Sequence, residues 1–139
     1  MQETASGTKS YTKGPIFWEG DVADSMYVIR KGKVKVTKNV HGILVRIAEL
    51  GPGDYFGEMG LLDGVSRSAS ALAETRVEVE EYDRKGLAEL ISAQPEFAFT
   101  MLRAMSKRLR EVDERLADLV AKGRLPKEDA VGIGMHPLC

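Results

Sequence analysis

The chain contains little cysteine and little histidine, and this limits the chemistry that it can carry out. Its 139 residues include one cysteine, Cys139, and two histidines, His41 and His136. A lone cysteine cannot form an intrachain disulfide, and a prenylation signal would need it four residues from the end, so we expect a reducing, intracellular setting. Two separated histidines do not provide the clustered ligands of a catalytic metal site, and no nucleophile-base pair can be argued. We therefore predict that the protein is not an enzyme and uses no metal or cofactor.

The sequence also lacks a charge imbalance and long apolar runs. Twenty basic residues against 21 acidic ones leave a net charge of -1, which gives no overall attraction to nucleic acid or to an anionic membrane. No stretch approaches the roughly 20 apolar residues of a membrane span, and the N-terminus has no apolar secretory core. We expect one soluble, cytoplasmic domain without a nucleic-acid or membrane partner.

Apolar and polar residues alternate with a period of two through much of the chain. The segments around Val34 and Val77 alternate valines with lysines or glutamates, which is the pattern of strands with one buried face. Turn signals separate such segments at roughly the 8 to 12 residue spacing of antiparallel architectures. The pattern predicts a mainly β fold with α-helix, in which residues 10–83 form an antiparallel jelly-roll (double-stranded β-helix) barrel after a disordered lead at residues 1–9.

After Asp83, an N-cap residue type, the period becomes that of a helix. Gln94-Pro95 ends a first helix and begins a longer second one, so two helices are predicted over residues 84–122. Residues 123–139 contain glycine and proline without a periodic pattern and are predicted to be an irregular tail. That tail is too short for a helix-turn-helix, so we expect no DNA-reading part.

The long helix has a narrow apolar stripe, which we call the seam. The seam residues recur at alternating spacings of three and four, as in a coiled coil. They are Leu102, Met105, Leu109, Val112, Leu116 and Leu119. We predict a parallel homodimer through the seam, with Arg108 of one copy near Asp113 of the other. The alternative is packing against the barrel of the same chain, for which Phe97, Phe99 and Met101 are better placed.

Residues 56–70, FGEMGLLDGVSRSAS, form the most informative segment of the chain. Gly57 and a second glycine three residues later allow the backbone to approach a ligand closely, and Glu58 between them is an acceptor for hydroxyls. A helical turn there would direct free N–H groups at an anion. Arg67 supplies a planar fork of donors for phosphate oxygens, and Ser68 adds a hydroxyl and a backbone N–H. The segment predicts a pocket for one phosphate attached to a sugar.

This segment resembles the phosphate-binding cassette of cyclic-nucleotide-binding domains, the module of the catabolite activator (Crp/Fnr-like) proteins and of the regulatory subunits of cyclic-AMP-dependent kinase. Three preceding motifs also resemble that family at its usual spacing. They are residues 16–21 (IFWEGD), 26–32 (MYVIRKG) and 51–58 (GPGDYFGE). The resemblance covers about residues 10–122 and implies a stand-alone cyclic-nucleotide-binding domain.

The resemblance implies a 3′,5′-cyclic nucleotide as the regulatory ligand and assigns roles to the cassette residues. Arg67 would pair with the equatorial oxygens of the cyclic phosphate, and Ser68 would complete that shell. Glu58 would accept the ribose 2′-hydroxyl, with help from the backbone groups of Gly57 and Met59.

The base would lie in an apolar slot. Val36, Ile47 and Leu50 are the barrel residues expected to line it, because their alternation should turn them into the interior. On the long helix, Val112 and Asp113 occupy the position from which the activator branch reads the adenine amino group. Asp113 could accept a hydrogen bond from either purine, and Arg108 could stack on either base.

The predicted function is a sensor that binds cyclic AMP or cyclic GMP and signals by repositioning its C-terminal helices, with cyclic AMP favoured. The alternative is the same fold without nucleotide binding, or with another effector, acting as a dimeric protein-interaction module. Arg67 and Glu58 are both present, which favours a working pocket. The sequence does not identify the downstream protein.

Overall fold

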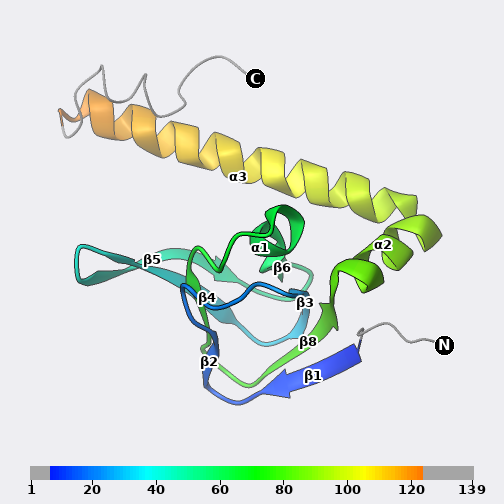
Figure 1. Cartoon of the computed structure of the whole chain (residues 1–139). Coiled ribbons are helices and arrows are strands. Elements are labelled where there is room, and N and C mark those ends of the chain that lie inside the picture. The colour runs from blue at the N-terminus through cyan, green and yellow to red at the C-terminus, as the bar shows by residue number, and fades with distance from the viewer. Residues whose placement is uncertain (1–6, 124–139) are drawn as a thin grey trace. The chain divides into compact units, whose positions relative to one another are not determined.

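The computed structural model describes residues 7–123 (Figure 1). The chain divides into two compact units, residues 1–90 and 91–139. The first unit contains all eight described strands, and the second contains the long helix α3. The helix α2 crosses the boundary between them.

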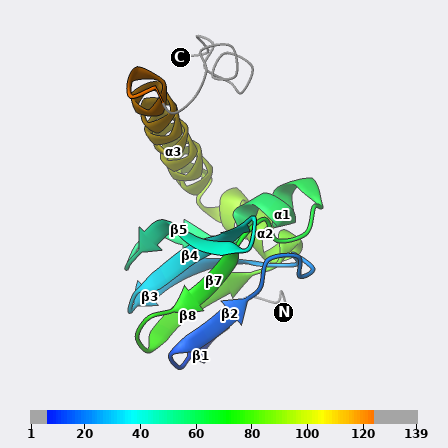
Figure 2. The same ribbon diagram turned by 90° about the vertical axis from the view of Figure 1, so that its left-hand side faces the viewer.

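The first unit consists of two four-stranded antiparallel sheets. One sheet has the order β1 (Gly7–Tyr11), β8 (Val77–Tyr82), β3 (Met26–Lys31) and β6 (Tyr55–Phe56). The other has the order β2 (Gly14–Phe17), β7 (Ser70–Ala73), β4 (Val34–Val40) and β5 (Ile43–Leu50). Figure 2 shows β1, β8 and β3 side by side. This arrangement, followed by two C-terminal helices of which the last is long, confirms the predicted fold class.

The core is built from the alternating apolar residues of both sheets. Its buried members are Tyr27, Ile29, Val34, Phe56, Ala71, Ala73, Val77 and Val79. The rings of Tyr27 and Phe56 stack with centroids 4.9 Å apart. Burying each large apolar side chain contributes about 1.5 to 3 kcal/mol. The period-two pattern therefore identified Val34, Val77 and Val79 as residues of a buried face, whereas the other core residues come from β3, β6 and β7.

The N-terminal strand β1 corrects the predicted lead. Residues 7–9 were expected to be disordered, yet β1 begins at Gly7 and pairs with β8. Backbone pairing with β8 and the ion pair between Lys9 and Glu81 stabilise this edge strand. Since its side chains are exposed, its sequence shows no apolar alternation. The rest of the lead, residues 1–6, lies outside the described residues.

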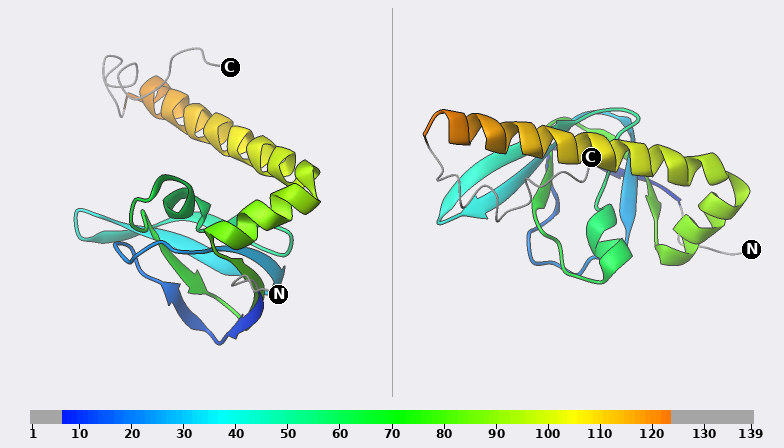
Figure 3. Two further views of the ribbon diagram at one scale, coloured as in Figure 1. Left: turned by 45° about the vertical axis from the view of Figure 1, so that its right-hand side comes forward. Right: turned by 90° about the horizontal axis from the view of Figure 1, so that it is seen from above.

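The helices begin and end near the predicted residues. In α2 (Arg84–Ala93), the N–H of Gly86 donates to Oδ1 of Asp83 at 2.7 Å, as an N-cap requires. α3 (Pro95–Ala121) begins with a proline at its first turn and has 27 residues, a length of about 40 Å. It is one uninterrupted helix in both views of Figure 3. Of the predicted tail, residues 124–139 lie outside the described residues.

Candidate functional site

The cassette backbone runs from β6 through the short helix α1 (Glu58–Asp63) to Arg67 and β7. A glycine in the left-handed conformation flanks each end of α1. Gly57 precedes the helix with φ 80°, and Gly64 follows it with φ 77°. Only glycine adopts this conformation without strain. The two glycines therefore set the turns by which the chain enters and leaves α1.

Gly57 also has no room for a side chain. A Cβ at this position would lie 2.9 Å from Nη1 of Arg67 and 3.3 Å from Cδ1 of Tyr27. The cassette backbone thus approaches the arginine directly, whereas the close approach to a ligand that the sequence predicts for this glycine stays a prediction. Gly60, inside α1, is restricted in a different way, since a Cβ there would overlap the Cβ of Ala23.

The backbone of Arg67 is fixed by the turn at Gly20-Asp21. The N–H of Arg67 donates to the carbonyl of Asp21 at 2.8 Å, and the N–H of Gly20 donates to the carbonyl of Arg67 at 2.8 Å. The carboxylate of Asp21 accepts a hydrogen bond from the N–H of Trp18 at 2.9 Å, which closes that turn. The IFWEGD motif and the cassette, far apart in sequence, therefore meet at Arg67.

The Arg67 side chain is buried, with 5% of its surface exposed. Nη1 donates to the carbonyl of Gly57 at 2.7 Å and Nη2 to the carbonyl of Ser25 at 2.8 Å. The guanidinium carbon lies 4.0 Å from the centroid of the Phe17 ring, close enough for a cation–π interaction. Among the described residues, Nε of Arg67 has no hydrogen-bond partner. A buried, oriented cation with an unused donor is suited to binding an anion.

Ser68, the predicted partner of Arg67, is exposed. Its carbonyl accepts a hydrogen bond from Nζ of Lys38 at 2.6 Å. That ammonium also lies 3.3 Å from Oε2 of Glu19. The hydrogen bond from the backbone N–H of Asn39 lowers the pKa of Glu19 below its usual value, and the hydrogen bond from Lys38 lowers it further. Lys38 thus adds a second positive charge next to the cassette, which the sequence did not predict.

The predicted ribose residues begin α1. Glu58, its first residue, has only 4% of its surface exposed, whereas Met59 is exposed. A carboxylate in the first turn of a helix faces the positive end of the backbone dipole. Glu58 also follows Gly57 directly in the chain, and the Gly57 carbonyl accepts a hydrogen bond from the Arg67 guanidinium. Of the predicted phosphate and ribose residues, the structure therefore brings Gly57 against Arg67, whereas Met59 and Ser68 are exposed.

The predicted base residues of the barrel do not all share one face. The β4–β5 register pairs Val34 with Leu50 and Val36 with Ala48, so these four share a face. Ile47 falls at a bulge, where the register skips it, and it is 40% exposed. The expectation that alternation turns Ile47 inward with Leu50 is therefore wrong, because strand residues three positions apart face opposite sides, and the register in addition skips Ile47 at the bulge.

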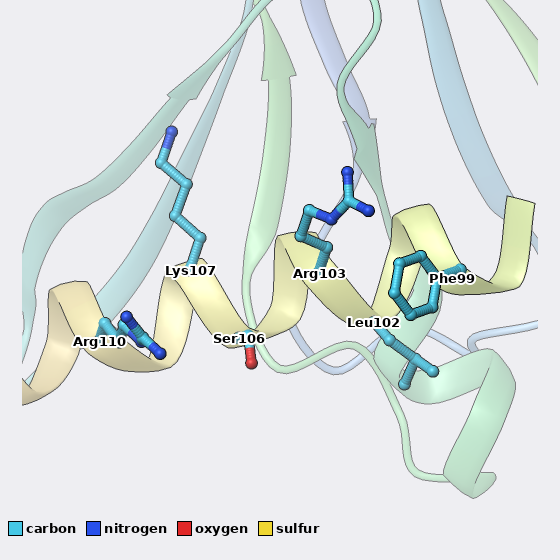
Figure 4. Close-up of a pocket in the computed structure, with 6 residues that line it drawn as sticks. All are labelled: Phe99, Leu102, Arg103, Ser106, Lys107 and Arg110. Carbon is cyan, nitrogen blue, oxygen red and sulfur yellow. The ribbon is translucent and has the colours of Figure 1, made fainter. Parts of the chain in front are cut away.

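The remaining predicted base residues, Arg108, Val112 and Asp113, lie on α3 in the second unit, so their role toward the base stays a prediction. The surface of α3 has a hollow, and the lining side chains that belong to residues 7–123 come from this one helix (Figure 4). They are Phe99, Leu102, Arg103, Ser106, Lys107 and Arg110. The guanidinium of Arg103 lies 4.9 Å from the Phe99 ring centroid. No cassette residue lines this hollow.

The sequence did not predict three residues that contact the site, namely Phe17, Ser25 and Lys38. Each contacts Arg67 or Ser68 from a different strand or loop. Phe17 lies within the IFWEGD motif and Ser25 directly precedes the MYVIRKG motif. The motifs could have indicated the segments, but not the contacts.

Within the described part of the chain, no helix is both long enough and apolar enough to cross a bilayer. The cyclic nucleotide-binding domain family matches residues 9–94. The CRP-like cAMP-activated global transcriptional regulator of Mycobacterium tuberculosis is 35% identical over 117 residues, which cover 81% of this chain and 52% of that protein. The cyclic AMP receptor protein of Thermus thermophilus is 40% identical over 108 residues, covering 76% of this chain and 50% of that protein.

The fold agrees with these relatives. The crystal structure of the Thermus thermophilus catabolite activator protein superposes with a TM-score of 0.75 at 37% identity, over 84% of this chain and 55% of that one. The chain spans about half the length of the curated relatives that it matches. The match over residues 9–94 includes the whole cassette and both sheets except the first two residues of β1. This chain belongs to the cyclic nucleotide-binding domain family.

Proposed function

We propose that this protein is a sensor that binds a 3′,5′-cyclic nucleotide at the cassette, with the phosphate on Arg67. The observation that carries the proposal is the buried guanidinium, held on the Phe17 ring and on two carbonyls while its Nε has no partner among the described residues. Enclosing a cation costs several kcal/mol unless an anion or hydrogen-bond acceptors compensate. A singly charged cyclic phosphate would supply that anion.

The sugar and the base would follow from the same anchor. Glu58 would accept the 2′-hydroxyl, with the backbone of Gly57 and Met59 beside it. Ser68 would add donors to the phosphate. For the base, Val36 and Leu50 share the half-buried face of the β4–β5 pair, and Leu50 packs against the core.

Cyclic AMP is the favoured ligand. The two relatives described above carry cAMP or cyclic AMP in their names, and the cassette keeps the arginine and the glutamate that cyclic nucleotides need. Arg108 and Asp113 of α3 could contact either purine, so cyclic GMP is the competing ligand in the experiment below.

The signal would pass from the cassette into the C-terminal helices. Nη2 of Arg84, the first residue of α2, donates to the carbonyl of Leu61 in α1 at 2.6 Å. A shift of α1 on ligand binding would therefore act directly on the start of α2. We expect a population shift between two arrangements of the helices, with the ligand favouring one of them.

The surface that passes the signal on would be the seam of α3, through which two copies would form a homodimer. Leu102 and Leu109 are more than 60% exposed, and Val112 is also exposed. Apolar side chains at heptad spacing gain most from burial against a second such helix. An ion pair between Arg108 and Asp113 of two copies would add at most about 1 kcal/mol.

Calorimetric titration with cyclic AMP and cyclic GMP tests the proposal. The wild type should bind at least one of them, and Arg67→Ala should weaken binding by about 30-fold or more, because truncating one partner of a buried charge pair costs about 2 to 5 kcal/mol. Arg76→Ala, which removes the same charge from an exposed turn, is the control and should bind like the wild type. No heat with either nucleotide would favour the alternative of an interaction module.

A further inference from the structure

We propose that Ser25, held by Glu81, is a positioning residue for the phosphate arginine, Arg67. The inference rests on the proposed function, since it concerns how the nucleotide site is kept in its binding geometry. It assigns a role to a polar network that reaches from the cassette to the N-terminal strand β1.

Ser25 joins two parts of the site through its two oxygen atoms. Its carbonyl accepts the hydrogen bond from Nη2 of Arg67 at 2.8 Å. Its hydroxyl donates to Oε2 of Glu81 at 2.7 Å, and the residue is only 4% exposed. The direction of the carbonyl depends on the orientation of the Ser25 peptide group. A side chain bonded to a carboxylate restrains that orientation.

Glu81 is itself fixed from two sides. Oε1 of Glu81 lies 2.6 Å from Nζ of Lys9 on β1. In the register, Glu81 faces Gly7 of β1 on one side and Tyr27 of β3 on the other. The carboxylate that holds Ser25 is therefore anchored across three strands. Tyr27 adds a further contact, since its hydroxyl lies 3.2 Å from that of Ser25.

Three of the groups that contact the guanidinium come from different parts of the sequence. Gly57 holds Nη1, Phe17 lies against the guanidinium plane and Ser25 holds Nη2. Removing the hydroxyl of Ser25 leaves its carbonyl in place but frees the peptide group to turn. The guanidinium would then sample more orientations, and binding of a phosphate in one orientation would lose affinity.

The neighbouring residue Glu80 provides a matched control. It lies on the same strand β8, and its Oε1 accepts a hydrogen bond from Nη2 of Arg30 at 2.7 Å. This pair joins β8 to β3, and neither of its residues is among the contacts described for Arg67. Its loss should therefore affect stability without affecting nucleotide affinity.

The test measures the affinity for cyclic AMP by calorimetry and the thermal unfolding of each variant. Ser25→Ala and Glu81→Ala should each weaken binding by about three-fold to ten-fold, the effect of one hydrogen bond. Ser25→Thr, which keeps the hydroxyl, should bind within about two-fold of the wild type. Glu80→Ala should also bind cyclic AMP within about two-fold of the wild type, even if its melting temperature falls.

The loss of affinity in Ser25→Ala must also depend on the Arg67 side chain. In an Arg67→Lys background, where the guanidinium fork is lost, Ser25→Ala should cause no further loss of affinity. The same loss in both backgrounds, or wild-type affinity in both Ser25→Ala and Glu81→Ala, would overturn the inference while leaving the nucleotide site intact. Failure of the wild type to bind any cyclic nucleotide would instead overturn the proposed function, and the inference with it.

Discussion

Replacing Gly57 by alanine separates backbone strain from contact with Arg67. Gly57 and Gly64 flank α1 with nearly the same conformation, φ 80° and φ 77°. A Cβ at Gly57 would lie 2.9 Å from Nη1 of Arg67, whereas a Cβ at Gly64 would have nothing within 4 Å. The two alanine variants therefore share the same strain and differ in the contact.

The expected magnitudes follow from that difference. The left-handed conformation costs alanine about 1 to 2 kcal/mol, so Gly64→Ala should lose that much stability. Gly57→Ala should lose about 3 kcal/mol or more, because it also disturbs the hydrogen bond from Arg67 to the Gly57 carbonyl, a bond to a charged donor. In a chain of 139 residues, each kcal/mol lowers the melting temperature by about 3 to 4 °C.

Nucleotide affinity distinguishes the two variants more sharply than stability does. Calorimetric titration with cyclic AMP should show a loss of about ten-fold or more for Gly57→Ala, and an affinity within about two-fold of wild type for Gly64→Ala. Equal affinities of the two variants would refute the reasoning that the Gly57 backbone positions the guanidinium.

Three further outcomes are expected. Gly60→Ala should lose about 1 to 3 kcal/mol in urea denaturation, because its Cβ would overlap Ala23; an unchanged midpoint would contradict the packing. The hydrogen bond from Arg30 lowers the pKa of Glu80 from its usual 4.5, so the stability that this carboxylate contributes is complete above that value and disappears as the pH falls through the folded pKa. Arg30→Met should therefore reduce the difference in unfolding free energy between pH 7 and pH 3, and an equal difference would be evidence against this pair. Sedimentation should show Leu109→Lys as a monomer and the wild type as a dimer; a dimeric variant would exclude the seam.

The sequence predicted the parts of the fold that have a strong local pattern. The alternation around Val34 and Val77 indicated strands that bury one face, and both residues are fully buried. Asp83 was predicted to be an N-cap and accepts the N–H of Gly86. The residue type at Gly57 indicated a backbone without room for a side chain, and the structure shows this, whereas the role of Arg67 toward a phosphate stays a prediction. These features depend on residues near one another in the chain.

The features that the sequence did not reveal depend on pairing between distant segments. β1 has exposed side chains, so its pairing with β8 leaves no apolar period. The bulge at Ile47 inserts one residue into a strand whose composition gives no sign of it. The contact of Ser25 with Arg67 joins residues 42 positions apart. Such residues come together only when distant segments pair and pack in the folded chain.

A crystal structure of the protein, from crystals grown with cyclic AMP, would test the central claim most directly. The account predicts that the guanidinium of Arg67 lies within about 3 Å of the equatorial phosphate oxygens, with the Glu58 carboxylate at the ribose 2′-hydroxyl. A structure with the nucleotide bound elsewhere, and with Arg67 still bonded only to the carbonyls of Gly57 and Ser25, would contradict it.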